Sequence, residues 1–317
     1  MQASARRRAF VGLLAATAVA VAAVVAAAAG IGRPRAVALS APAPSSSTSL
    51  LQLEDDRGRV VVLPAAPMRI VSLAPHATEL LFAIGAGRKV VAVDRDSDFP
   101  PQVRALPRVA AYPQPDVEQL LALAPDLVVI WGPGASRALI ARLEQLGLAV
   151  FVSEPHTLDE VGATLARFAV LSDDPAAAFG AARAFRARLA AIRSRYADRR
   201  PVRVFVQVWS SPLIGIGDQG VIAEAVRACG ARSVLSGAVP AAPQVDPEAV
   251  LAARPEMVLA TDGARAERFW RERGLLAPQG PARFVALDAA TMERPGPRVL
   301  DALERMCTAI DAARSSS

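Results

Sequence analysis

The sequence DVEQLLALAPDLVV at residues 116–129 returns in altered form as DPEAVLAARPEMVL at residues 246–259. In both copies we expect an acidic residue to cap a short helix with its side chain. A glutamate follows two positions later on the first turn, and a proline ends the helix before an acid and an apolar run. Acidic side chains suit the first turn of a helix, where the backbone N–H groups lack helical partners, and proline ends a helix. The chain therefore contains a repeated helix–strand unit, with one copy in each half.

Short apolar strands alternate with helical stretches around each copy. In the first half the apolar runs are residues 70–73, 90–93, 127–130 and 150–152. Residues 136–146 carry leucine and isoleucine at helical spacing. In the second half the alternation restarts, with apolar runs at 202–206, 257–259 and 284–287 and a final helix from about 297 to 313. This alternation is typical of α/β lobes with largely parallel sheets.

The segment between the two halves reads as one long helix. Residues 174–198 are rich in alanine, arginine and leucine, contain no proline after Pro175, and begin with an Asp-Pro pair suited to a helix start. At 1.5 Å per residue such a helix runs about 35 Å, as a stiff strut. We predict two Rossmann-like α/β lobes, at residues 56–172 and 200–317, joined by a single long rigid helix at 173–199.

Composition and charge support a folded, multi-lobed protein. The 317 residues are 53% hydrophobic, enough to bury two cores of domain size. Five of the 36 lysines and arginines lie in residues 1–50, which hold no acid, leaving 31 basic residues against 30 acidic ones beyond. Because the body is nearly neutral, we do not expect nucleic acid as a partner.

The N-terminal segment has the layout of an export signal. Three arginines at residues 6–8 precede an uncharged alanine-rich run at 9–32 and small residues at 36–38, which predicts a signal peptide at 1–38. The two arginines directly before Ala9-Phe10-Val11 also fit a twin-arginine signal, and the run is long enough to stay as an uncleaved membrane anchor. The Pro- and Ser-rich residues 39–55 are predicted to be a flexible tether.

Cysteine and histidine are scarce. A disulfide between Cys229 and Cys307 suits an exported chain and would contribute roughly 4 kcal/mol in the chain-entropy model. Two separately buried thiols are the alternative. With two cysteines and only His76 and His156 as histidines, no dedicated zinc or manganese site is expected.

Catalytic motifs give little support to an enzyme. GIGDQG at residues 215–220 matches the glycine pattern of nicotinamide-dependent oxidoreductases, but it trails its strand and lacks an acid about 20 positions later, so a glycine-rich turn is favoured. The alternating acids Asp94, Asp96 and Asp98 suggest a calcium loop, yet Phe99 stands at its glycine position. No GxSxG or HExxH motif occurs. We predict a protein that is not an enzyme and has no cofactor.

The run RIVSLAPHATELLFAIG at residues 69–85 resembles the opening of periplasmic binding proteins for cobalamin and iron chelates, which serve ABC importers. The likeness covers nearly everything after about residue 55, through residues 97–102, the repeat around Glu118, and residues 239–240, 243–245, 293–294 and 297–298. The chain is most similar to the cobalamin-binding branch, in which two cysteines placed like Cys229 and Cys307 form a disulfide between a helix and the last helix.

The resemblance implies a periplasmic, monomeric substrate-binding protein that holds a corrinoid in the cleft between its lobes. Tyr112 and Trp131 stand where aromatic residues flank the corrin, Trp209 belongs to the corresponding loop of the second lobe, and Arg294 matches a cleft arginine. For the aromatics, ordinary packing is the alternative. The predicted ligand-binding set is Pro75, His76, Tyr112, Trp131, Trp209, Leu213 and Arg294. The sequence departs from the branch at Asp96, Ala242 and Ala290, where the pattern has an aromatic, a tryptophan and an acid.

The repeated glutamates also match the family. Glu118 and Glu248 stand where one glutamate per lobe docks onto arginines of the permease dimer in the inner membrane. The alternative is that both merely favour the dipole of a short helix.

Other ligands and roles stay open. Tyr112 lies within about one residue of the axial tyrosine of haem-binding relatives, with His76 as a candidate second iron ligand, and a ferric siderophore is a third ligand class. A membrane-anchored sensor or scaffold of the same fold is the alternative outside transport.

Overall fold

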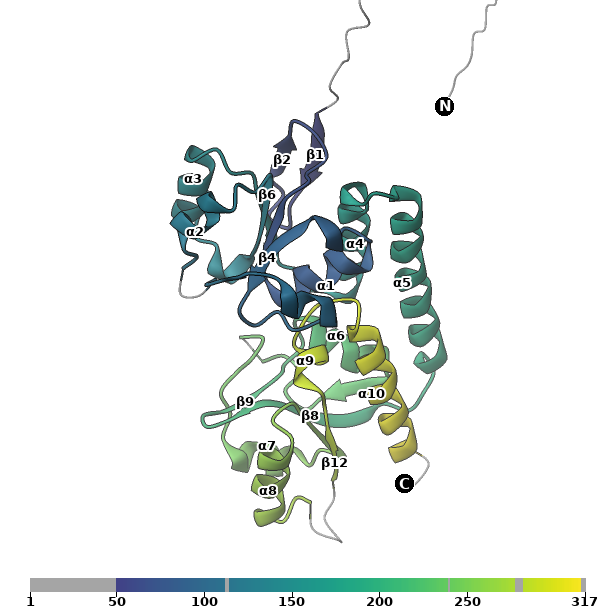
Figure 1. Cartoon of the computed structure of the whole chain (residues 1–317). Helices are drawn as coiled ribbons and strands as arrows, with labels where there is room; N and C mark the ends of the chain where they lie inside the picture. The colour runs from purple at the N-terminus through teal and green to yellow at the C-terminus, as the bar shows by residue number, and fades with distance from the viewer. Residues whose placement is uncertain (1–49, 112–113, 239, 277–281, 315–317) are drawn as a thin grey trace, which may run out of the picture. The chain divides into compact units, whose positions relative to one another are not determined.

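The computed structural model describes residues 50–111, 114–238, 240–276 and 282–314, and these form two α/β lobes, each built on its own sheet (Figure 1). The sheet strands of the N-terminal lobe are β3 (Ile70–Leu73), β4 (Val90–Asp94), β5 (Arg108–Val109), β6 (Leu127–Trp131) and β7 (Val150–Ser153). They lie in the order β5-β4-β3-β6-β7, and all pairs are parallel. The predicted fold class is confirmed.

The C-terminal lobe repeats this plan with one change. Its strands are β8 (Val202–Ser210), β9 (Leu213–Gly215), β10 (Ala231–Ser233), β11 (Met257–Ala260) and β12 (Arg283–Ala286). Four of them form the parallel order β10-β8-β11-β12, while β9 folds back antiparallel on β8. Gly215 of the GIGDQG string thus ends an antiparallel strand rather than a parallel one. That setting differs from the strand–turn–helix unit a dinucleotide-binding glycine pattern requires.

Helices cover the sheets. The N-terminal lobe carries α1 (Pro75–Ala83), α2 (Val117–Ala122), α3 (Arg137–Gln145) and α4 (Leu158–Phe168). The C-terminal lobe carries α6 (Val221–Ala228), α7 (Pro247–Ala253), α8 (Ala264–Glu272), α9 (Ala289–Met292) and α10 (Val299–Arg314). Short 3₁₀ turns occupy Gly87–Lys89, Pro101–Ala105, Gly132–Gly134 and Ala169–Leu171. Strands β3, β7 and β11 are buried along their whole length, as expected for parallel strands covered on both faces.

One long helix connects the lobes: α5 (Pro175–Tyr196), which lies inside the range predicted for it. It starts where the Asp174 carboxylate accepts a hydrogen bond from the Ala177 N–H at 3.0 Å, with proline at the first helical position. Its buried residues, among them Leu189, join a core that continues from Phe168 of the first lobe to Met306 of the second. Since one core runs through α5 into both lobes, the helix supports them as a strut.

Ion pairs hold the same helix from both sides. Arg193 contacts Asp159 of α4 at 2.8 Å and Glu224 of α6. Arg188 lies 2.7 Å from both Asp301 and Glu304 of α10. Ion pairs therefore join α5 to each lobe, in addition to the packing of its buried apolar residues.

The predicted caps of the repeat differ between the two copies. The Asp116 carboxylate accepts a hydrogen bond from the Gln119 N–H at 3.0 Å at the start of α2, as predicted. Asp246 occupies the same place before α7, but among the described residues its side chain makes no capping bond. Its backbone carbonyl accepts from Ala249 and Val250 instead. The expectation of a side-chain cap is therefore wrong for the second copy.

The folded body begins earlier than predicted. Strands β1 (Leu51–Glu54) and β2 (Val60–Leu63) form an antiparallel hairpin, and Leu53 and Leu63 bury their side chains in the core of the first lobe. The predicted tether at 39–55 therefore extends too far, because alternate leucines in its last residues pack as a strand. Residues 39–49 and the predicted signal peptide lie outside the described residues.

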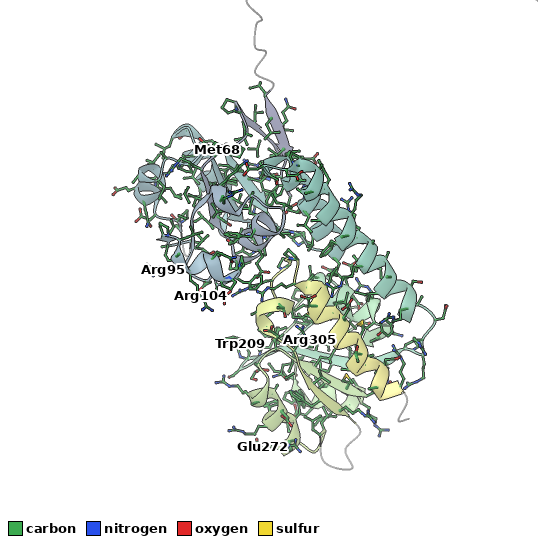
Figure 2. All side chains as sticks on the ribbon, turned by 45° about the vertical axis from the view of Figure 1, so that its right-hand side comes forward. Met68, Arg95, Arg104, Trp209, Glu272 and Arg305 are labelled. Carbon is green, nitrogen blue, oxygen red and sulfur yellow. A yellow bond between two sulfur atoms is a disulfide. The ribbon has the colours of Figure 1, made fainter. Side chains whose placement is uncertain are left out.

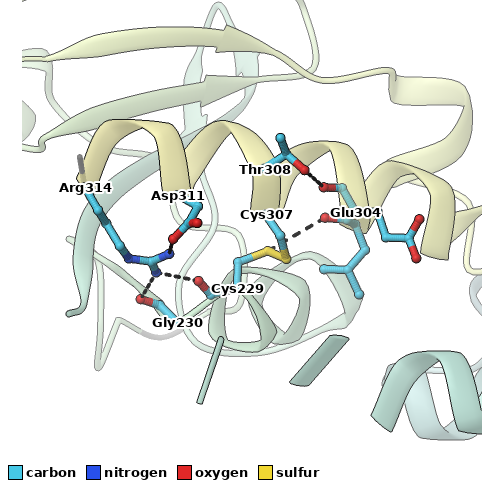
Figure 3. Close-up of a disulfide and its surroundings, with 8 residues drawn as sticks. Cys229, Gly230, Glu304, Cys307, Thr308, Asp311 and Arg314 are labelled. Carbon is cyan, nitrogen blue, oxygen red and sulfur yellow. Dashed lines mark hydrogen bonds and ion pairs between the residues drawn. A yellow bond between two sulfur atoms is a disulfide. The ribbon is translucent and has the colours of Figure 1, made fainter. Parts of the chain in front are cut away.

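A disulfide joins Cys229, at the end of α6, to Cys307 in α10, as the resemblance implied. Both cysteines are fully buried. Figure 3 shows that Arg314, at the end of α10, donates to the backbone carbonyls of Cys229 and Gly230 at 2.6 and 2.8 Å. The last helix is therefore fixed to the second lobe by a covalent bond and by charge-assisted hydrogen bonds.

Candidate functional site

A cavity of about 370 Å³ opens at the carboxyl ends of the first lobe's central strands. Its N-terminal-lobe wall includes Leu73, Pro75, His76, Asp94, Ile130 and Trp131, which end β3, β4 and β6 or begin α1. Residues 293–295 of the C-terminal lobe close the other side. The cavity thus lies between the lobes, where ligands of open α/β sheets bind.

A second cavity of about 610 Å³ adjoins the first and shares Trp131, Glu293 and Pro295 with it. The first lobe contributes residues 154–156 and the second lobe contributes Ile216, Val221, Ile222, Ala241 and Ala242. Because three residues line both spaces, we treat the two cavities as one interlobe cleft.

Among the described residues, Trp131 is the one tryptophan, tyrosine or phenylalanine that lines this cleft. It ends β6, whose other four residues are buried, yet 47% of its surface is exposed. An indole held at the end of a rigid strand offers a large apolar face at little entropic cost. This is the geometry required to stack against a flat or puckered ring system.

His76 lies in the wall as the second residue of α1. Its Nε2 atom is 2.9 Å from the Ser153 hydroxyl, and only 4% of the residue is exposed. Burial lowers the pKa of His76 to about 4, so its ring is neutral at pH 7. The side chain therefore adds a hydrogen-bonding group to the cleft but no charge.

The buried imidazole predicts a loss of stability on mild acidification. Its folded-state pKa of about 4 lies below the ordinary 6.5, so the unfolded chain binds the proton first and stability falls as the pH drops from about 6.5 towards 4. Between pH 7 and pH 5 this one group removes about 2 kcal/mol. We expect urea unfolding to show that extra drop in wild type but not in His76→Gln.

The exposed His156 provides the matched control for this measurement. His156→Gln should keep the wild-type drop, because its side chain is largely in solvent. If both variants retain the full drop, His76 is not the titrating group.

Arg294 lines the first cavity but is already engaged by the opposite lobe. Its Nη1 atom lies 2.5 Å from the Asp98 carboxylate and its Nη2 donates to the Asp96 carbonyl at 3.2 Å. The hydrogen bond from Arg294 holds the pKa of Asp98 below its ordinary value. The predicted cleft arginine is therefore present, with its charge largely neutralised by an aspartate of the first lobe.

A second pair ties the same wall segment to the first lobe. Arg298 donates two hydrogen bonds, of 2.9 and 2.5 Å, to the carboxylate of Glu79 on α1, and its guanidinium lies 4.1 Å from the centre of the Phe99 ring. Only 3% of the Glu79 side chain is exposed. Together with the Arg294 contacts, this pair holds residues 293–295 against the N-terminal lobe.

Two predicted ligand-binding residues lie apart from the cleft. Leu213 is only 6% exposed and packs in the core with Phe205 and Trp270, because it pairs antiparallel with Ser210 as the first residue of β9. The structure therefore places Leu213 outside both cavities, and its predicted role as a ligand contact stays a prediction. Trp209, 57% exposed, lines neither cavity, and its indole N–H donates to the Ser211 carbonyl at 2.9 Å.

Figure 2 shows Trp209 at the margin of the C-terminal lobe. Tyr112 falls outside the described residues, so its predicted role stays a prediction. The adjacent Ala111 lines the first cavity.

Several cleft residues were not predicted from sequence. Asp94, considered only as part of a calcium loop, lies in the cavity wall, and burial raises the pKa of its carboxyl. Val221 and Ile222 enter the second cavity from the start of α6. Their place in the sequence could have identified such residues, because residues that directly follow the strands of a parallel sheet gather at one edge of that sheet.

The described part of the chain carries neither a metal-binding cluster nor a membrane-spanning helix. No cluster of three or more His, Cys, Asp or Glu residues there is arranged to hold a metal ion. None of the described helices combines the length and apolar character needed to span a membrane.

Two parallel-sheet lobes, a long connecting helix and a cleft lined from both lobes define a two-lobed binding protein. The sequence profile of the periplasmic binding protein family matches residues 70–276, and the chain belongs to that family. It is 37% identical to the vitamin B12-binding protein of Vibrio cholerae over 254 residues, which cover 79% of this chain and 92% of that relative. The vitamin B12-binding protein of Photorhabdus laumondii is 32% identical over 249 residues, covering 77% and 88%.

Solved structures show the same relationship. The crystal structure of the periplasmic vitamin B12 binding protein BtuF of Vibrio cholerae superposes with a TM-score of 0.70 at 35% identity, covering 78% of this chain and 98% of that one. The periplasmic heme-binding protein RhuT from Roseiflexus, in apo form, gives a TM-score of 0.67 at 25% identity, covering 78% and 98%. The fold is thus shared by relatives whose names report two different ligands.

Proposed function

We propose that the chain is the substrate-binding protein of an ABC importer, and that it captures cobalamin or a related corrinoid between its lobes and delivers it to the membrane permease. The observation that carries the proposal is the interlobe cleft with Trp131 lining both of its cavities. The identity of about one third with vitamin B12-binding proteins, over most of their length, supports the same ligand class.

The chemistry of the cleft fits a corrinoid. Such a ligand has a large puckered ring with apolar faces and an edge of amide groups. Ile130, Ile216 and Trp131 supply apolar surface, while the carboxylates that line the cavities are acceptors for hydrogen bonds that ligand amides can donate. The two cavities together reach the upper end of the roughly 300–1,000 Å³ typical of ligand pockets.

Binding without catalysis is part of the proposal. The relatives named above are binding proteins by name. The Ser153 side chain is buried, and its hydroxyl is hydrogen-bonded to the His76 ring. We propose that the chain works in the periplasm as a monomer without a cofactor, with cobalamin as transported ligand only.

The repeated glutamates supply a docking surface in this proposal. Glu118 lies in the first turn of α2 and Glu248 in the first turn of α7, both exposed. An exposed ion pair is worth under about 1 kcal/mol, so we expect these carboxylates to set register and encounter rate with permease arginines rather than overall affinity.

The docking assignment is tested by Glu118→Ala combined with Glu248→Ala. We expect cyanocobalamin affinity to stay within about twofold of wild type, while uptake by cells that depend on this protein falls about tenfold. Glu144→Ala combined with Glu267→Ala is the matched control, since both carboxylates are exposed and lie on other helices. A loss of ligand affinity in the first double variant would contradict the assignment.

Haem is the second candidate ligand, favoured by the structural likeness to heme-binding proteins and by the neutral imidazole in the cavity wall. The test is the spectrum with haemin, where an iron–tyrosinate band lost in Tyr112→Ala would support haem. If neither ligand binds, the importer role points to a siderophore. The anchored sensor or scaffold is disfavoured if permease and ATPase genes adjoin this one.

A further inference from the structure

The charged lining of the cleft is predominantly acidic. Among the described residues, the Asp, Glu, Lys and Arg side chains that line the two cavities are four acids and one base: Asp94, Asp96, Glu154, Glu293 and Arg294. His76 is neutral because burial lowers its pKa to about 4. A ligand in this cleft therefore faces an excess of negative charge.

The single arginine does little to offset that excess. Asp98 lies 2.5 Å from Arg294 Nη1, and Glu79 lies 3.9 Å from the same atom. Arg298, the next cation along the chain, is held by both oxygens of Glu79. Because these carboxylates lie so close, the Arg294 guanidinium in the C-terminal-lobe wall is neutralised and does not act as a free cation.

Glu154 has a partial partner of its own. Arg57 lies 3.7 Å from it but donates its hydrogen bonds to the carbonyls of Gly132 and Ala135. Negative charge therefore concentrates at Asp96 and Glu293, around the first cavity, whereas burial raises the pKa of the Asp94 carboxyl in the same wall.

We infer that this wall selects a macrocycle edged with uncharged amides over one edged with carboxylates, and that Asp98 is a specificity-determining residue because it neutralises Arg294. An amide N–H donates to a carboxylate, whereas a ligand carboxylate is repelled by it. The inference rests on the proposed function and extends it from ligand class to the basis of selection. Asp98 itself does not contact the ligand in this proposal, because it acts by pairing with Arg294.

The test compares ligands of one shape and different charge. Cyanocobalamin is titrated against its three monocarboxylic acids, in each of which one propionamide has been hydrolysed to a carboxylate. We expect wild type to bind every monocarboxylate more weakly, at least one by about tenfold, with the difference shrinking in 1 M salt as charges are screened.

The variant Asp98→Asn tests the contribution of Asp98 by itself. The variant frees the charge of Arg294, so we expect the monocarboxylates to gain about fivefold while cyanocobalamin changes less than twofold. Arg294→Gln should move the monocarboxylates the opposite way, and the double variant should lose the gain. Glu267→Gln is the charge-matched control, because Glu267 pairs with Arg271 on α8 and lines neither cavity.

The outcomes separate this inference from the function it extends. If wild type fails to bind cyanocobalamin, the proposed function is wrong and the inference falls with it. If cyanocobalamin binds and all three monocarboxylates bind within twofold of it, or if Asp98→Asn and Glu267→Gln act alike, the function stands and the charge selection is overturned.

Discussion

Trp131→Ala is expected to lower the affinity for cyanocobalamin about 100-fold. The indole lines both cavities and 47% of the residue is exposed, so a ring bound in the cleft would cover part of that surface. Buried aromatic anchors contribute about 2–4 kcal/mol at binding sites, and about 2.7 kcal/mol corresponds to that factor. Calorimetric titration of wild type and variant measures the change.

The chain offers a matched control in its second lobe. Trp209→Ala removes the same side chain from the end of β8, where it is exposed and lines neither cavity, and we expect less than a threefold change. Urea unfolding should leave both variants close to wild type, because both residues are largely exposed. Equal losses of affinity in the two variants would contradict the position given to Trp131.

Arg298→Ala should destabilise the protein by about 4 kcal/mol, the effect expected when a buried carboxylate loses its partner. The change would leave the Glu79 carboxyl group on α1 without this partner, and only 3% of its side chain is exposed. The remaining cation, Arg294, lies 3.9 Å away and is already paired with Asp98. The measurement is the free energy of unfolding in urea at pH 7.

Two further variants show whether the burial of the pair is responsible. Arg271→Ala breaks an exposed pair with Glu267 on α8 and should cost under about 1 kcal/mol. Replacing both Glu79 and Arg298 by methionine should recover most of the loss, because no uncompensated charge remains. If Arg298→Ala costs no more than Arg271→Ala, the pair does not hold the wall of the cleft.

The features predicted well from sequence were those with a local signal. The runs at 70–73 and 127–130 are strands because a short, largely apolar stretch suits a sheet covered on both faces. The helix α5 followed from the Asp-Pro start and the absence of later prolines. The repeat found the start of both α2 and α7, although only Asp116 caps with its side chain.

The features missed depend on contacts between distant residues. Glu79 and Arg298 are 219 positions apart, and nothing local distinguishes either from a surface charge. Leu213 turns into the core because β9 folds back on β8, a pairing that a three-residue strand does not announce in its sequence. The hairpin at 51–63 was obscured by the Pro- and Ser-rich stretch before it.

The candidate site also combines residues that the sequence indicated with contacts that only the tertiary structure shows. The resemblance supplied Pro75, His76, Trp131 and Arg294, and the structure places all four around one cavity. It did not separate Trp131 from Trp209, since each lies at or near the end of a strand and only the tertiary arrangement shows which one enters the cleft. Nor did it show that Asp98 engages Arg294 from the other lobe.

Calorimetric titration of the purified protein with cyanocobalamin and haemin in parallel tests the central claim most directly. The account predicts tight one-to-one binding of cyanocobalamin, with haemin binding at least tenfold more weakly, as an acidic cleft disfavours its two carboxylates. Tight binding of haemin with no binding of cyanocobalamin would contradict it.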